Sequence, residues 1–195
     1  MSGRPAIFFD RDGTLIEEVQ YLIDAANIRL VDSAVEAMKM VNESGSLCVV
    51  VTNQSAVARG QLHESELKRI NDEISHRFSK QGARIDTVFC CPHHPSIGVD
   101  PYAVDCTCRK PKPGLLLEAA AALEIDLERS VLIGDSLRDI EAGHRGGCLS
   151  VLVLTGNGSD EVLNLEQGVP KLEEPDYIGS DILRAVIWAL ERISE

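Results

Sequence analysis

The stretch FFDRDGTL, residues 8–15, joins the end of an apolar run to two aspartates and a glycine. The run begins at Ala6 and predicts a strand that is buried on both faces of a sheet. Asp10 and Asp12 follow it two residues apart, so an extended backbone would point both carboxylates the same way. Burying two carboxylates without a cation is unfavourable, so a core role is excluded. The stretch therefore predicts a functional site at the end of a buried strand.

Apolar runs alternate with amphipathic segments along the rest of the chain. Further strands are predicted at LCVVV (47–51), IDTVFC (85–90), SVLIG (130–134) and LSVLVL (149–154). Helices are predicted at 33–45, where Ser33 and Glu36 form a capping box, and at 64–81, 114–124, 137–145 and 180–193. This order predicts an α/β fold, a Rossmann-like three-layer sandwich with a central parallel sheet and helices on both faces. Residues 176–178 are a candidate for one more strand, and the terminal helix is expected to pack on the sheet.

The length and the charge limit the kind of partner. The chain has 195 residues, which fits a single domain spanning 1–195. Its net charge of −12 comes from 19 Lys and Arg against 31 Asp and Glu. This charge disfavours nucleic acids and anionic membranes and favours a small ligand held by local cations. The sequence shows neither a signal peptide nor an apolar run long enough to span a bilayer, so a cytoplasmic location is expected. The acidity and the lack of an obvious exposed apolar helix favour a monomer.

Polar residues follow three of the predicted strands. Asp10 and Asp12 follow the first, Thr52 and Asn53 lie at the end of the second, and Asp135 follows the run at 130–134. Ligands of open α/β sheets bind at the carboxyl ends of the strands, so these groups should meet at one edge. Carboxylate oxygens favour Mg²⁺, and Mg²⁺ with open positions suits a phosphate substrate.

Six cysteines divide into two kinds. Cys48 and Cys148 lie in apolar runs and are expected to be buried, inert thiols. The other four lie within residues 90–108, in CCPHHPSIGVDPYAVDCTC. Three thiolates and one imidazole would make a closed, structural zinc site. Spacing alone leaves the register open, since Cys90 or Cys91 and either of the two histidines at 93 and 94 would reach the metal.

Four segments taken in order resemble the motifs of the haloacid dehalogenase (HAD) superfamily phosphatases. They are FFDRDGTL, VVVTNQS, RKPKPG and IGDSLRD, and they span residues 8–139. The resemblance implies that Asp10 is the nucleophile and that Asp12 is the general acid and base, with Asp12 also binding Mg²⁺ through its backbone carbonyl. It implies that Thr52 and Lys110 bind the transferred phosphoryl group and that Asp135 completes the Mg²⁺ site. The role of Asp139 stays open between a ligand, a partner of a ligand and a surface residue.

The segment CPHHP followed by CTCRKPKPG resembles the zinc loop of the heptose bisphosphate phosphatases and the related histidinol phosphatases. This resemblance implies the zinc ligands Cys91, His93, Cys106 and Cys108. Zinc would order a loop that ends directly before Arg109 and Lys110. These relatives lack a large cap domain, and the spacing of the motifs here leaves no room for one.

The substrate implied by the resemblance is a small phosphorylated sugar, D-glycero-D-manno-heptose 1,7-bisphosphate, losing its 7-phosphate. Histidinol phosphate is the alternative within the enzyme class, and a phospho-aspartate receiver domain is the alternative outside it. The chain differs from the heptose relatives at Gln20 and Ala56, where they carry glycine. The expected substrate contacts come from the strand ends and the following loops: Glu18, Tyr21, Thr52, Asn53, Gln54, Ser55, Arg109 and Lys110.

Overall fold

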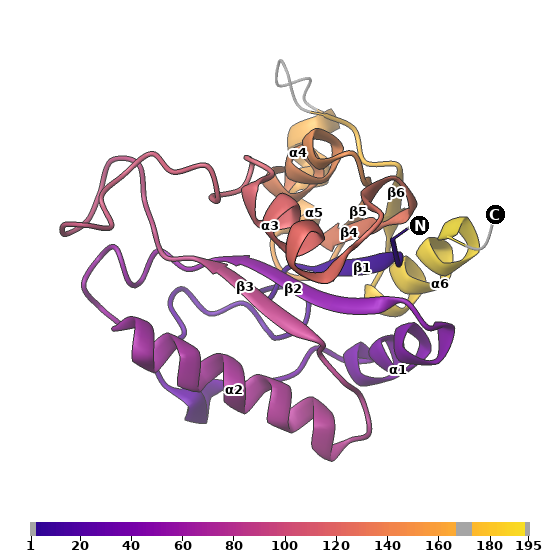
Figure 1. The fold of residues 1–195 in the computed structure, drawn as a ribbon, viewed down its shortest axis with the longest axis horizontal. Helices are drawn as coiled ribbons and strands as arrows, with labels where there is room; N and C mark the ends of the chain where they lie inside the picture. Colours follow the sequence, from indigo (N-terminus) through magenta and orange to yellow (C-terminus); the bar gives the residue numbers. More distant parts are fainter. Residues whose placement is uncertain (1–2, 167–172, 194–195) are drawn as a thin grey trace.

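A computed structural model describes residues 3–166 and 173–193 and contains one six-stranded parallel sheet (Figure 1). The strands are β1 (Ala6–Phe9), β2 (Leu47–Asn53), β3 (Thr87–Cys91), β4 (Val131–Gly134), β5 (Leu149–Val153) and β6 (Tyr177–Gly179), in the order β3-β2-β1-β4-β5-β6. The α-helices are α1 (Ala34–Ser44), α2 (Glu64–Lys80), α3 (Gly114–Leu123), α4 (Leu137–Gly146), α5 (Gly158–Glu166) and α6 (Ile182–Ile193). The predicted α/β sandwich is therefore confirmed.

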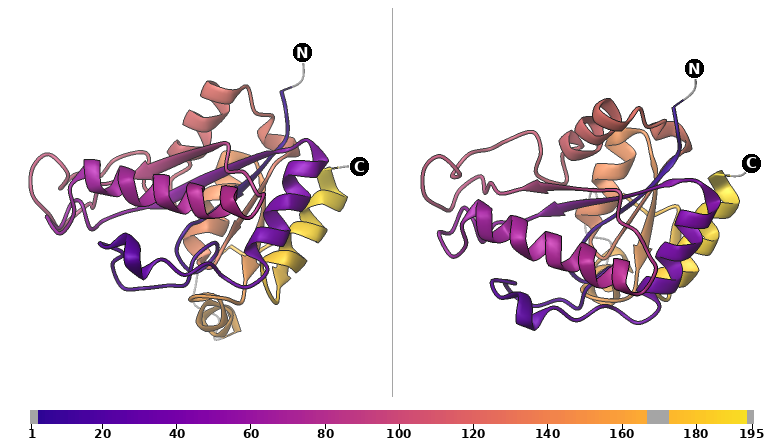
Figure 2. Two further views of the ribbon diagram at one scale, coloured as in Figure 1. Left: turned by 90° about the horizontal axis from the view of Figure 1, so that it is seen from below. Right: turned by 60° about the horizontal axis from the view of Figure 1, so that its bottom comes forward.

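The strand pleat assigns successive residues of β1 to opposite layers of the core. Ile7 and Phe9 pack with buried residues of α1, α2 and α6. Ala6 and Phe8 pack with residues of α3 and α4 on the other face. All four side chains are fully buried, which explains why the run carries no polar residue. Figures 1 and 2 show the resulting three layers, with α1 and α2 on one side of the sheet and α3 and α4 on the other.

Two helical details differ from the sequence prediction. Ser33 precedes α1 as expected, but its backbone is left-handed (φ 63°) and its side chain makes no capping hydrogen bond, so the predicted capping box is wrong. A left-handed residue directs its side chain away from the first turn of the helix. Helix α5 was not predicted, because GSDEVLNLE begins with glycine and has little apolar periodicity.

The C-terminal elements agree with the sequence prediction. The candidate strand at 176–178 is found as β6, shifted by one residue. The terminal helix packs against the sheet as expected.

His144 ties the end of α4 to the segment that leads into β6. Its Nδ1 lies 2.7 Å from Glu173 Oε2, and its Nε2 lies 2.9 Å from Asp176 Oδ2. Both ring nitrogens therefore face carboxylates, an arrangement that suits the doubly protonated imidazolium. Burial alone would lower the pKa of His144, but the hydrogen bonds to Asp176 and Glu173 outweigh burial and raise it.

The strand order places a topological switch point between β1 and β4. From β1 the chain builds the sheet outward through β2 and β3, and from β4 it builds outward through β5 and β6. Loops that leave the carboxyl ends of β1 and β4 therefore separate there and leave a crevice. Within the described ranges, no helix has the length and apolar character needed to cross a bilayer.

Candidate active site

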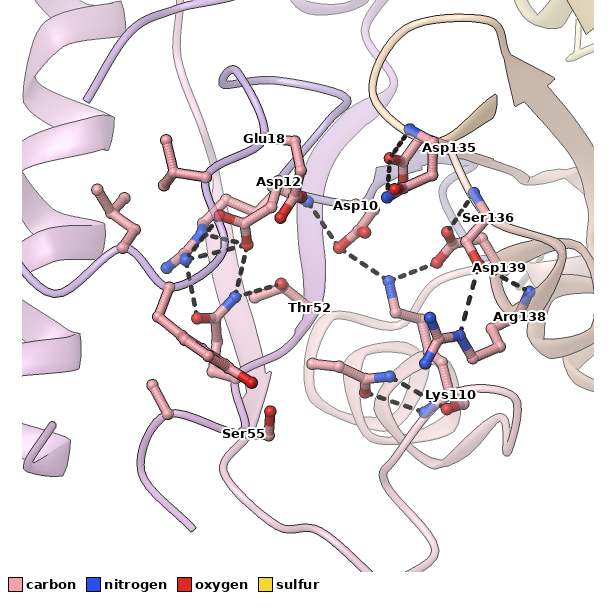
Figure 3. Close-up of a pocket in the computed structure, with 18 of the residues that line it drawn as sticks. Asp10, Asp12, Glu18, Thr52, Ser55, Lys110, Asp135, Ser136, Arg138 and Asp139 are labelled. Atoms are coloured by element: carbon pink, nitrogen blue, oxygen red, sulfur yellow. Dashed lines mark hydrogen bonds and ion pairs between the residues drawn. The ribbon is translucent and has the colours of Figure 1, made fainter. Parts of the chain in front are cut away.

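A pocket lies at the switch point and collects the polar residues that follow β1, β2, β4 and β5 (Figure 3). Oxygens of Asp10, Asp135 and Asp139 lie within 4.8 Å of one another there. Asp135 directly follows β4, and Asp139 lies in the first turn of α4. Both are buried, at 2% and 1% exposure, so Asp139 is not a surface residue. The sheet thus brings together carboxylates that lie more than 120 positions apart.

Lys110 is the cation that faces this acidic group. Its Nζ lies 2.9 Å from Asp10 Oδ1 and 2.5 Å from Asp139 Oδ1, and it donates to the backbone carbonyl of Val51 at 2.9 Å. The side chain is 5% exposed. Burial alone would lower the pKa of Lys110, but the charges of Asp10 and Asp139 outweigh burial and raise it. Lys110 therefore remains an ammonium ion inside the pocket.

Asp135 is fixed by the loop after β5. Its Oδ2 accepts hydrogen bonds from the backbone N–H and the side-chain amide of Asn157, at 2.8 and 2.9 Å. Gly13 and Gly156 approach the same oxygen so closely that a Cβ on either would collide with it, and both have positive φ. Only glycine meets both requirements without strain. These contacts hold the Asp135 carboxylate in one position facing Asp10.

The acidic group carries more negative charge than Lys110 neutralises. Burial, with the nearby charge of Asp10, raises the pKa of Asp135 to about 7. Three carboxylates against one ammonium leave a surplus of two negative charges when all are ionised, and a divalent cation would balance that surplus. All the side-chain donors are carboxylate oxygens, the ligand type that Mg²⁺ prefers. The residues therefore fit a Mg²⁺ ion.

The Asp12 carboxylate faces a different part of the pocket. It accepts hydrogen bonds from Arg11 Nε and Nη2, both at 3.0 Å, and from Gln54 Nε2 at 2.7 Å. The same Gln54 amide donates to Thr52 Oγ1 at 2.9 Å. This places the hydroxyl of Thr52, at the end of β2, in the same hydrogen-bonded group as Asp12. The Asp12 carboxylate is not among the clustered carboxylates of Asp10, Asp135 and Asp139.

Asn53 connects the end of β2 to the segment that carries the lysine. Its side-chain amide donates to the backbone carbonyl of Lys110 and accepts from the backbone N–H of Lys110, both at 3.1 Å. The neighbouring Arg109 donates from Nη1 to the carbonyl of His93 at 3.0 Å and also lines the pocket. The position of Lys110 thus depends on β2 and on the loop that contains His93.

A second group of potential ligands lies beside the pocket. Cys91, His93, Cys106 and Cys108 converge, with ligand atoms within 4.8 Å of one another. The Sγ atoms of Cys106 and Cys108 are 3.2 Å apart, and the Sγ of Cys91 lies 3.5 Å from that of Cys106. The Nδ1 of His93 lies 3.4 Å from Cys108 Sγ. A tetrahedral site with Zn–S bonds of about 2.3 Å separates its sulfur atoms by about 3.8 Å, so the group is slightly tighter than a zinc site and has the ligands to form one.

The pleat of β3 decides between the adjacent cysteines. Cys91 is buried on the α3 face of the sheet, with Cys106 and Cys108 packed nearby. Cys90 packs on the opposite face, where its Sγ accepts a hydrogen bond from Asn71 of α2 at 3.1 Å. Consecutive residues of a strand point to opposite faces, so the two cannot contribute to one cluster. The grouping matches the register implied by the resemblance. Cys48 and Cys148 are both buried, as expected.

The loop 18–22 closes another side of the pocket. Glu18 and Tyr21 both line it, together with Gln20, and Ser55 lines it from the β2 side. Burial, with the charges of Asp12 and Asp10, raises the pKa of Glu18 to about 7. The guanidinium carbon of Arg59 lies 5.5 Å from the centre of the Tyr21 ring, within the range of a cation–π contact. Glu18, Tyr21 and Ser55, which the sequence predicts as substrate contacts, therefore line the same pocket.

Four polar lining residues were not identified from the sequence: Arg11, Ser136, Arg138 and Asn157. Arg11, Ser136 and Arg138 stand inside the motifs FFDRDGTL and IGDSLRD, beside aspartates whose positions at strand ends already predict a role. Asn157 follows β5, and the same strand-end rule that identified the other residues would have included it. The sequence also predicts eight contacts to the phosphate and the sugar. All eight line this pocket: Glu18, Tyr21, Thr52, Asn53, Gln54, Ser55, Arg109 and Lys110.

Comparisons with known proteins agree with this geometry. Residues 107–185 match the HAD-hydrolase-like family model. D-glycero-beta-D-manno-heptose-1,7-bisphosphate 7-phosphatase of Escherichia coli K12 is 36% identical over 184 residues, covering 88% of this chain and 96% of the relative. The corresponding Haemophilus influenzae enzyme is 38% identical over 152 residues, covering 77% of this chain and 82% of the relative.

A solved structure extends the similarity to three dimensions. The D,D-heptose 1,7-bisphosphate phosphatase of B. bronchiseptica, crystallised with magnesium and phosphate, superposes with a TM-score of 0.83 at 29% identity. The match covers 96% of this chain and 98% of that structure. The ordered motifs, the fold and the curated relatives agree, and the chain belongs to the HAD-like phosphatase family that contains the D-glycero-beta-D-manno-heptose-1,7-bisphosphate 7-phosphatases.

Proposed function

We propose that this chain is a Mg²⁺-dependent phosphomonoesterase that removes the 7-phosphate of D-glycero-D-manno-heptose 1,7-bisphosphate through an aspartyl-phosphate intermediate. The observation that carries the proposal is the placement of Asp10 beside Lys110, Asp135 and Asp139 at the switch point, in one pocket with Thr52 and Asp12. The similarity to enzymes named for this substrate supports the choice of sugar.

Asp10 is the proposed nucleophile. One of its carboxylate oxygens would attack phosphorus and the bond from phosphorus to the sugar oxygen would break, leaving the phosphoryl group on Asp10. Asp12 would give its proton to the departing sugar oxygen and later take a proton from the water that hydrolyses the intermediate. Mg²⁺, held by the carboxylates of Asp10 and Asp135 and the backbone carbonyl of Asp12, would neutralise phosphoryl oxygens during both steps.

The phosphoryl group would be bound by donors at the end of β2 and by the buried ammonium. Thr52 offers its hydroxyl, and Lys110 offers a charge that burial keeps from being screened. Asp139 would act by holding Lys110, since their side-chain atoms are 2.5 Å apart. Asn53 would position Lys110 through the two hydrogen bonds to its backbone.

The sugar would contact the loops around the pocket. Glu18 and Tyr21 line the pocket and would face sugar hydroxyls, with Gln54 and Ser55 on the β2 side. Arg109 lines the pocket as a cation for the distal phosphate or the sugar, and the exposed Arg138 adds a second positive charge to the same lining. The partner is thus a small phosphorylated sugar.

Zinc is the proposed occupant of the cluster of Cys91, His93, Cys106 and Cys108. Four protein ligands would fill a tetrahedral site, so its role would be structural. The cluster ends one residue before Arg109, whose side chain donates to the carbonyl of His93. Zinc would therefore hold the loop that presents Arg109 and Lys110 to the substrate.

The test is phosphate release with Mg²⁺ from both anomers of heptose 1,7-bisphosphate and from histidinol phosphate, with ³¹P NMR to identify the phosphate that leaves. A preference for a heptose anomer with loss of the 7-phosphate is expected. Faster turnover of histidinol phosphate would overturn the sugar assignment.

The nucleophile has its own test. Asp10→Asn should abolish turnover and prevent trapping of a phosphorylated protein, because an amide oxygen is a poor nucleophile. Asp72→Asn is the control, since Asp72 is an exposed residue of α2 in a surface ion pair with Lys68. Normal turnover by the Asp10→Asn protein would contradict the assignment.

A further inference from the structure

Arg11 is the largest of the fully buried side chains and lies between the two catalytic aspartates in sequence. It is 1% exposed. Its Nε donates to Asp12 Oδ2, and its Nη2 donates to Asp12 Oδ1, both at 3.0 Å. This is the two-point geometry that fixes both the distance and the plane of a carboxylate. Such an arrangement sets the orientation of Asp12 as well as compensating its charge.

The remaining donors of Arg11 hold two side-chain amides. Nη2 also donates to Gln54 Oε1 at 2.8 Å, and Nη1 donates to Asn71 Oδ1 at 2.9 Å. Because the guanidinium takes the oxygen of Gln54, the NH₂ group of Gln54 faces Asp12 and Thr52. Arg11 therefore orients Asp12 directly and also through Gln54.

Asn71 anchors this network to the body of the protein. It lies on α2, is 7% exposed, and uses its NH₂ group to donate to Cys90 Sγ. Both functional groups of the Asn71 amide are thus engaged, which fixes its oxygen toward Arg11. The Arg11 guanidinium is therefore fixed on two sides. Asp12 binds it on one side, and Asn71 of α2, which is itself bonded to Cys90 of β3, binds it on the other.

We infer that Arg11 is a positioning residue for catalysis, which directs the Asp12 carboxylate so that one acceptor position on Oδ1 faces the proton-transfer route. The inference rests on the proposed acid–base role of Asp12. An ionised carboxylate has about four acceptor positions. From the described residues, Oδ2 accepts two hydrogen bonds and Oδ1 accepts one. The second position on Oδ1 is then the one from which the proton passes to the leaving oxygen and to which the proton of water returns.

A double-mutant cycle tests this inference, using Arg11→Gln, Asp12→Asn and the double variant with heptose 1,7-bisphosphate and Mg²⁺. General acid–base catalysis contributes about 10²–10⁴-fold to a rate. Arg11→Gln is expected to lower kcat by about 10–100-fold with little change in KM, because it misdirects Asp12 while the Arg11 side chain, 1% exposed, offers almost no surface to the substrate. In the Asp12→Asn background the same change should alter kcat by less than about threefold, because no proton-transferring carboxylate is left to direct.

Two further variants separate positioning from a purely structural effect. Arg77→Gln is the matched control, because Arg77 is a partly buried arginine that donates to the backbone carbonyls of Ile28 and Ala25. Any fold loss in kcat caused by Arg77→Gln should be the same in the parent protein and in the Asp12→Asn variant. Asn71→Leu leaves Arg11 in place but removes its anchor, so it serves if Arg11→Gln fails to fold. It should also lower kcat only where Asp12 is present.

The outcomes distinguish the inference from the function on which it rests. Equal fold losses for Arg11→Gln in both backgrounds, or for Asn71→Leu if Arg11→Gln does not fold, would overturn the positioning role and leave the proposed reaction standing. Full kcat in Asp12→Asn alone would overturn the acid–base role of Asp12 and the positioning role with it. A large loss confined to proteins that retain Asp12 would support both.

Discussion

Replacing Lys110 with methionine would remove the cation that contacts both Asp10 and Asp139 in the acidic group. Lys110 is 4% exposed and contacts Asp10, Asp139 and the carbonyl of Val51 within 3 Å. Removing one partner of a buried ion pair typically costs about 3–5 kcal/mol, because the remaining charge is left uncompensated. For a chain of this size each kcal/mol lowers Tm by about 2–4 °C. We expect metal-free Lys110→Met protein to melt about 6–20 °C below the parent.

The assay is denaturant and thermal unfolding at pH 8 in EDTA, repeated with saturating Mg²⁺. At pH 8 the carboxylate of Asp135, whose pKa burial raises to about 7, is largely ionised. Mg²⁺ should narrow the gap between variant and parent, because it binds the folded state and neutralises the same carboxylates. Lys68→Met is the control, since Lys68 is 76% exposed and its surface pair with Asp72 contributes at most about 1 kcal/mol. Equal destabilisation of the two variants would refute the electrostatic reasoning.

Three further predictions concern the zinc-ligand cluster, the support of Asp135 and the ion pairs of His144. Cys108→Ser should reduce bound zinc from about one atom per chain to near zero by mass spectrometry and lower Tm, whereas Cys148→Ser should keep its zinc. Asn157→Ala removes one of the two hydrogen bonds to Asp135, so calorimetry should show Mg²⁺ binding about 10–100-fold more weakly; unchanged affinity would contradict the role of this contact. Because the pKa of His144 is raised in the folded state, its stabilising contribution is complete below about pH 6.5 and is lost as pH rises through the raised value. Unfolding free energies of His144→Gln and the parent should therefore differ most below about pH 6.5, by up to about 1 kcal/mol, and converge as pH rises through the raised pKa.

The sequence predicted the middle of the sheet well because β1, β2, β4 and β5 are almost wholly buried, with helices over both faces. The run AIFF must be apolar throughout to pack against helices on either side, so its composition reports its place in the fold. The start of α1 was predicted wrongly because capping depends on backbone geometry, and the left-handed conformation of Ser33 cannot be read from residue types. Helix α5 lacks a strong apolar stripe, so its sequence does not distinguish it from a loop.

Site residues that directly follow a strand could be predicted from the sequence. Roles that depend on contacts between side chains far apart in the sequence could not. Asp10, Thr52 and Asp135 each follow a strand, and topology alone brings them together. The partnership of Asp139 with Lys110 was left open, because it joins two residues 29 positions apart through a contact of 2.5 Å. The role of Arg11 is not predictable from the sequence, because a charged residue beside two aspartates is typical of local charge balance, and its buried contact with Asn71 forms only in the folded chain.

Cys90 and Cys91 point to opposite faces of the sheet, so the zinc-ligand cluster on one face and the Asn71–Arg11 network on the other both depend on the length of β3. Deleting or inserting one residue before this pair would slip the strand by one position and exchange the faces of both side chains. Cys91 would then leave the ligand cluster, and Cys90 would leave Asn71 and the network behind Arg11. A single slip would thus disturb the zinc loop and the orientation of Asp12 together. Changes in the length of β3 should therefore be tolerated far less than changes in the exposed loop between His94 and Cys106.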